Sequence, residues 1–131
     1  MPLDARLLLY STLLTWLMII VASNLRTRSW TPVGLKLSFG NRHDMPGPSP
    51  VAERADRAAR NMLENLLLFV ALIVAAHLAG APQERIDLGA RVFFYARVLY
   101  FPAYLAGIAY LRTLIWTVSV IGLGVIFMAA L

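Results

Sequence analysis

Apolar residues fall into four long blocks along the chain, and charged residues cluster between the blocks. The blocks cover about 3–22, 60–79, 88–105 and 114–131. Roughly 20 predominantly apolar residues are enough for a helix to cross the hydrocarbon core of a bilayer. The pattern therefore predicts an all-α membrane protein, a bundle of four transmembrane helices that forms a single domain over residues 1–131.

The first block has one rival interpretation, a secretory signal peptide. We do not favour it, because the block is too long for the apolar part of a signal and Asp4 stands where basic residues are expected. A polar, interrupted segment follows over about 24–50. It ends in the run M-P-G-P-S-P, Met45–Pro50. Since proline lacks an N–H and fixes φ, this segment is predicted to be a loop.

The second and third helices differ from the first and fourth in their charges. The second helix is predicted to begin near Val51, and its charged first turns should project beyond the membrane. The sequence Gly80–Pro82 ends it. The third block contains Arg91 and Arg97, and Pro102 predicts a kink. The fourth block carries no charge.

Composition supports a membrane location and indicates an orientation. Hydrophobic residues make up 60% of the chain and charged residues 15%, which is too apolar for a soluble domain of this size. The net charge is +5, and we attribute it to positive-inside bias and not to a nucleic-acid partner. One side carries only Arg6 and Arg85 near its span ends, so the opposite side, with the loop at 24–50, is predicted to face the cytoplasm. The basic residues on that side are Arg26, Arg28, Lys36, Arg42, Arg54, Arg57, Arg60 and Arg112.

Polar residues at the start of the second helix are spaced to share one face. In E-R-A-D-R-A-A-R-N-M-L-E-N, helical spacing groups Arg57, Asn61 and Glu64, and Arg54 extends the same face by one turn. An ionisable residue at the membrane boundary usually faces the interior of a bundle and needs a partner. Two interpretations stay open from the spacing, an ion-paired helix entrance and a binding site.

The third helix offers a second group in A-R-V-L-Y-F-P-A-Y. Arg97, Tyr100 and Tyr104 fall on one helical face. Arg97 lies mid-span, although snorkelling could lift its guanidinium toward the cytoplasmic side. The tyrosines could also form an interfacial aromatic belt. Arg112 follows in Y-L-R, and taken alone it is best explained as a positive-inside anchor.

Together these residues favour a pocket for an anionic, polar ligand beside a lipid-facing surface. Arginine binds carboxylates through two parallel hydrogen bonds, and a nearby positive charge lowers the pKa of a thiol. The chain has no cysteine, so any thiol must come from a ligand. There is no Gly-rich phosphate loop and no metal-binding set, and His43 and His77 do not build a Ser-His-Asp triad.

The quoted motifs, with Y-L-R-T-L-I-W after them, resemble the MAPEG family, the membrane-associated proteins in eicosanoid and glutathione metabolism. The likeness covers nearly the whole chain and is strongest to bacterial-type members similar to microsomal glutathione S-transferases. It implies a homotrimer of four-helix subunits in a bacterial inner membrane. It also implies that glutathione, a co-substrate, binds at the subunit interfaces on the cytoplasmic side.

The resemblance assigns roles by position. It implies that Arg112 activates the glutathione thiol, with Tyr104 assisting. Tyr100 departs from several members, which have histidine there, and the spacing from Tyr104 to Arg112 is one residue shorter than in some. Arg28 is matched loosely, through an arginine that follows the first helix, for which Arg26 is the alternative. The glutathione-binding residues implied are Arg57, Asn61, Glu64, Arg97, Tyr100, Arg54 and Arg28.

These assignments imply a glutathione-dependent transferase or peroxidase that acts on hydrophobic electrophiles or lipid hydroperoxides. The expected partners are membrane lipids, glutathione, a hydrophobic small molecule and two further copies of the chain. The alternative is a non-enzymatic lipid-binding or scaffold protein, which the family also contains. A transporter is disfavoured, because four spans without an internal repeat give little support for alternating access.

Overall fold

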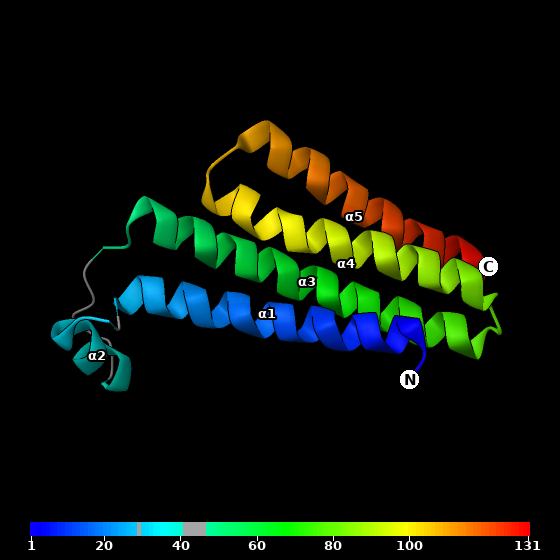
Figure 1. Cartoon of the computed structure of the whole chain (residues 1–131), viewed down its shortest axis with the longest axis horizontal. Helices are drawn as coiled ribbons and strands as arrows, with labels where there is room; N and C mark the ends of the chain where they lie inside the picture. The colour runs from blue at the N-terminus through cyan, green and yellow to red at the C-terminus, as the bar shows by residue number, and fades with distance from the viewer. Residues whose placement is uncertain (29, 41–46) are drawn as a thin grey trace.

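The computed structural model describes residues 1–28, 30–40 and 47–131, and these form helices without any strand. Arg42, His43 and the start of the run Met45–Pro50 lie outside the described residues. Four long helices lie side by side, and a short one stands apart from them (Figure 1). The five described helices are α1 (Leu3–Thr27), α2 (Pro32–Phe39), α3 (Pro50–Leu78), α4 (Gln83–Leu105) and α5 (Ala109–Ala130).

The bundle has two ends with different contents. Both termini and the α3–α4 turn lie at one end, which we call the terminal end (Figure 1). At the opposite end α1 finishes, α3 begins, and α4 turns into α5. We call this the loop end, and all the predicted site residues come from helix segments near it.

The described part of the segment predicted as a loop over 24–50 includes helical residues. Helix α1 continues to Thr27 and ends at Arg28, whose φ of 54° is left-handed. Helix α2 then begins, because the Thr31 side chain accepts a hydrogen bond from the Gly34 N–H and Pro32 supplies a preset φ at the first position. The Ser38 hydroxyl donates to Thr27 Oγ1 at 2.9 Å and ties α2 back to α1. The prediction placed the end of the first helix too early.

Two other helices also begin earlier than their apolar blocks. Helix α4 begins at Gln83 instead of about 88, and α5 begins at Ala109 instead of about 114. Polar first turns belong to these helices, since backbone hydrogen bonds and not hydropathy set where a helix starts. The predicted start of the second helix agrees with α3, which Ser49 caps by accepting from the Ala52 N–H at 3.2 Å.

Glycines bring α4 and α5 into close contact near the terminal end. A Cβ atom placed on Gly89 would lie 2.6 Å from the Gly122 carbonyl oxygen, and one on Gly122 would lie 2.8 Å from the Phe93 nitrogen. Only glycine permits such a backbone approach. From this crossing the two helices diverge toward the loop end (Figure 1).

The outer surface of the bundle is apolar. Trp16, Leu67 and Leu114 have exposed fractions of 64%, 70% and 62%. Among the described residues, α1, α3 and α5 are each long and apolar enough to cross a membrane. Helix α4 does not reach that hydropathy because its arginines and acidic residues interrupt it, so a fourth span stays a prediction.

At the terminal end, polar side chains from three helices contact one another. Asp4, on the first turn of α1, is 1% exposed. Its carboxylate contacts His77 Nε2 of α3 and accepts a hydrogen bond from Gln83 Nε2 of α4 at 3.1 Å. His77 therefore contributes a packing contact between α1 and α3.

Candidate functional site

Arg97 is the most deeply buried charged residue among those described. Its exposed fraction is 0%, so snorkelling toward the membrane surface is excluded. Nη1 donates to Asn61 Oδ1 of α3 at 2.7 Å, while Nε and Nη2 are buried and find no hydrogen-bond partner among the residues that the structure describes. The guanidinium carbon lies 4.7 Å from the centroid of the Tyr100 ring and 5.7 Å from that of Phe93. Aromatic faces therefore partly compensate a cation that no described carboxylate neutralises.

Asn61 is held from two directions. Its side-chain Oδ1 accepts from Arg97, and its backbone carbonyl oxygen accepts a hydrogen bond from Asn65 Nδ2, on the next turn of α3, at 2.8 Å. Because the Arg97 contact occupies Asn61 Oδ1, the Asn61 side-chain NH₂ group is left to donate elsewhere. Asn61 lines a hollow beside α4 and α5, and this amide is a ready donor to a polar ligand in it.

The hollow lies between α3, α4 and the start of α5, where α4 and α5 diverge. Its volume is about 210 Å³. The rings of Tyr100 and Tyr104 pack with centroids 5.4 Å apart, and the Arg112 guanidinium carbon lies 4.9 Å from the Tyr104 ring. The structure thus brings three predicted residues from two helices to one wall. The lining residues are Asn61, Tyr100, Tyr104, Arg112, Thr113 and Trp116.

Arg57 joins this group from α3. Its Nε donates to the Tyr104 hydroxyl oxygen at 3.3 Å, and Nη1 lies 3.9 Å from Glu53. Its side chain is half exposed. Arg57 is therefore a cation at the rim of the hollow, linked through Tyr104 to Arg112.

Three predicted residues lie elsewhere. Arg54 Nε donates to the Leu105 carbonyl oxygen at 3.0 Å, so this side chain joins α3 to the end of α4. Glu64 is exposed on α3 beside Leu67 and Val70, and no described residue forms an ion pair with it. Arg28 is exposed at the end of α1.

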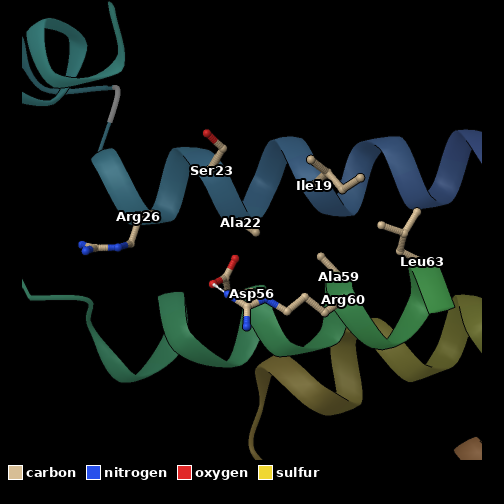
Figure 2. A pocket seen from close by; sticks show the side chains of 8 residues that line it. All are labelled: Ile19, Ala22, Ser23, Arg26, Asp56, Ala59, Arg60 and Leu63. Atoms are coloured by element: carbon tan, nitrogen blue, oxygen red, sulfur yellow. Dashed lines mark hydrogen bonds and ion pairs between the residues drawn. The ribbon is translucent and has the colours of Figure 1, made fainter. Parts of the chain in front are cut away.

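A second, larger hollow lies between α1 and α3 at the loop end. Its volume is about 430 Å³. Figure 2 shows Ala22 of α1 and Ala59 of α3 facing each other across it. Arg60 Nη2 lies 3.3 Å from Asp56 on one side, and Arg26 comes from α1 on the other. Of the two arginines considered after the first helix, the one that lines a hollow is Arg26.

Sequence reasoning missed several lining residues. Thr113 and Trp116 line the smaller hollow, and the motif Y-L-R-T-L-I-W contains both. Their spacing of three residues from one another is a helical signal that could have found them. Arg60 was interpreted only as an anchor, although it lines the larger hollow.

Comparison with known families identifies the chain. The model of the MAPEG family matches residues 6–131. The chain belongs to the MAPEG family. A search of curated proteins found no significant match. MAPEG members are membrane proteins that include glutathione transferases and peroxidases as well as non-enzymatic proteins. Membership and the exposed apolar helices together make this an integral membrane protein.

The MAPEG match gives the geometry a chemical context. The smaller hollow offers the guanidinium of Arg112, an amide and two phenol hydroxyls, and the guanidinium of Arg57 lies beside it on the Tyr104 hydroxyl. Such an arrangement can bind a small anionic, polar molecule and stabilise a negative charge that forms on it.

Proposed function

We propose that the protein is a glutathione-dependent membrane transferase or peroxidase, similar to microsomal glutathione S-transferases of the bacterial type. The observation that carries the proposal is the cationic cluster around the smaller hollow, in which buried Arg97 keeps two nitrogens unpaired. Burying a charge without full pairing is costly, so a structure that retains one has a use for it.

Glutathione binding would use the residues at the loop end. Arg57, half exposed at the rim, is placed to form paired hydrogen bonds with a glutathione carboxylate. Asn61 would donate its amide N–H to a polar group of the peptide. Arg97 lies behind Asn61 and Tyr100, so it would orient the amide and add positive potential at short range.

The thiol chemistry would centre on Arg112 and Tyr104. A guanidinium next to the thiol stabilises the thiolate and lowers the thiol pKa, and a phenol hydroxyl donates a further hydrogen bond. The thiol proton leaves to water. The thiolate sulfur then forms a bond to the electrophilic carbon of a hydrophobic substrate while the leaving group departs with the bonding electrons. Positioning both reactants in one hollow supplies the remaining acceleration.

The two hollows lie on different faces of α3. This arrangement supports a homotrimer in which two neighbouring subunits form each site together. Asn61 faces the smaller hollow, whereas Ala59 and Arg60 face the larger one. In the proposed trimer, the α1–α3 face of one subunit approaches the smaller hollow of the next. Glu64, exposed and unpaired within the described residues, would then meet the ligand or the neighbouring subunit. The proposed setting is a bacterial inner membrane with the loop end toward the cytoplasm.

The test uses the purified full-length protein in detergent. Glutathione at millimolar concentration should raise the thermal unfolding midpoint, and the protein should conjugate 1-chloro-2,4-dinitrobenzene. Arg112→Ala should lower kcat by about 100-fold, the scale for losing one donor to a developing charge. Arg6→Ala is the control, since this exposed arginine lies at the terminal end.

Two results would overturn the proposal at different levels. Unchanged conjugation in Arg112→Ala would refute the thiolate role alone. Absence of any glutathione binding by the unmodified protein would refute the ligand assignment and leave the lipid-binding or scaffold alternative, in which the same cations hold a lipid headgroup.

A further inference from the structure

A groove separate from both hollows runs between α4 and α5 on the outer side of the bundle. Its volume is about 440 Å³, and its exposed wall is almost entirely apolar. Helix α5 divides its side chains between two cavities: Thr113 and Trp116 face the smaller hollow, whereas Leu114 and Val118 face the groove. The lining residues are Arg91, Val92, Tyr95, Ala96, Leu99, Leu114, Ile115 and Val118.

The groove follows from the way the two helices pack. Close contact at Gly89 and Gly122 fixes α4 and α5 together near the terminal end. Toward the loop end the helices diverge (Figure 1), and side chains of the size of Leu99 and Leu114 do not fill the widening space. The result is an elongated apolar groove that lies along the helix axes.

Arg91 is the one charged residue that lines this groove. It lies eight residues into α4, about 12 Å along the helix from Gln83 at 1.5 Å per residue. Its side chain is exposed, and within the part of the chain that the structure describes it forms no hydrogen bond or ion pair. Since the apolar block of α4 starts at about 88, Arg91 lies only about 4.5 Å inside it, near the membrane boundary where a lipid phosphate can pair with its guanidinium.

We propose that the groove binds an acyl chain of an anionic membrane phospholipid whose phosphate pairs with Arg91. Guanidinium binds phosphate through two parallel hydrogen bonds. The chain would lie along α4 from Arg91 toward Leu99, a further eight residues or about 12 Å. Charge complementarity favours a lipid, because its phosphate supplies the anion that Arg91 lacks within the described residues and its acyl chain matches the apolar wall. The site does not depend on glutathione chemistry.

The experiment is native mass spectrometry of the full-length protein with added phosphatidylglycerol or phosphatidylcholine of identical acyl chains. The unmodified protein should retain phosphatidylglycerol preferentially. Arg91→Gln should lower that preference by roughly tenfold, the value of a hydrogen-bonded charge. Arg85→Gln is the matched control, because it removes an arginine from the same helix outside the groove. Leu99→Trp keeps Arg91 but fills the groove, and it should lower binding of both lipids.

Each alternative outcome is decisive, provided that Arg91→Gln and Arg85→Gln elute as the same folded species as the parent and that Leu99→Trp remains folded. An unchanged lipid preference in Arg91→Gln, or an equal loss in Arg85→Gln, would overturn the proposal in favour of general surface charge. If Leu99→Trp instead altered the oligomeric state while leaving lipid binding intact, the groove would be an interface between copies and the lipid assignment would be wrong.

Discussion

Asp4 at the terminal end and Arg97 near the loop end are both buried charged residues, but they differ in how far their neighbours satisfy them. At the terminal end, Asp4 is buried and satisfied by His77 and Gln83 from two other helices. Nearer the loop end, Arg97 is equally buried, but among the described residues two of its nitrogens find no hydrogen-bond partner, and the exposed Glu64 at the middle of α3 forms no ion pair. Polar groups that satisfy one another hold helices together, whereas polar groups left unsatisfied are available to something else. The contacts at Asp4 indicate a stabilising role, whereas the unpaired groups near the loop end support the proposed binding role.

The largest expected effect concerns the glycine crossing that belongs to the terminal end. Gly122→Val should lower the free energy of unfolding by about 3 kcal/mol, since its side chain would press on the α4 backbone. Gly124→Val is the control, because nothing lies within 4 Å of a Cβ there. Unfolding in mixed micelles measures both. If both variants lost the same unfolding free energy, the close contact at Gly122 would contribute nothing to stability.

Asp4→Ala should have the next largest effect, a loss of about 2 kcal/mol, because it leaves His77 and Gln83 without their buried acceptor. Asp87→Ala removes another carboxylate that accepts from Gln83, at 2.8 Å, but on the surface, and it should cost far less. Conjugation activity per folded molecule should be unchanged in both variants. A loss of activity in Asp4→Ala would contradict the separation of the two ends.

Arg97→Met should separate binding from stability. Replacing a buried cation with an apolar side chain of similar length is often neutral or stabilising, so the unfolding midpoint should stay the same or rise. Glutathione affinity should fall by about tenfold as Asn61 loses its contact. Arg91→Met, which also removes a charge from α4, is the control. Calorimetry measures glutathione affinity, and thermal unfolding measures the midpoint. A destabilised protein with unchanged affinity would make Arg97 a structural residue.

The smallest effect is expected at the rim of the larger hollow. Arg60→Gln breaks an ion pair with Asp56 in which both side chains are more than half exposed. Exposed pairs contribute little, so the unfolding free energy should change by less than about 0.5 kcal/mol. A loss above about 1 kcal/mol would show that another copy covers this pair in the assembled protein, and would sharpen the trimer proposal.

The long helices could be predicted because a block of about 20 apolar residues has few other stable forms in a membrane. Their ends could not be read from hydropathy, since polar turns such as the start of α4 extend the hydrogen-bonded helix. Helix α2 had a local signal in Thr31 and Pro32, a cap followed by a proline. The positions of the apolar blocks do not reveal that signal.

Spacing on a single helix grouped Arg97, Tyr100 and Tyr104 correctly, as their contacts show. Spacing could not reveal that Arg54 turns toward the Leu105 carbonyl, because that contact joins residues 51 positions apart. Nor could it divide Asn61 and Arg60 between two hollows, which depends on the helices packed against each face of α3. The roles of the site residues in glutathione binding stay predictions.

The glycine crossing also sets the mechanics of the site. Arg54 holds the end of α4 against α3, so if α5 rotated relative to α4, the close contact at Gly122 would be the point about which it turned. Arg112 lies ten residues from that point, a lever arm of about 15 Å at 1.5 Å per residue. Rotation of α5 by about 5° would therefore displace the Arg112 backbone by about 1.3 Å, and a misplacement of about 1 Å can change a rate by about 100-fold. A lipid bound between α4 and α5 would contact the segment of α5 between Gly122 and Arg112, and it could therefore shift the position of Arg112.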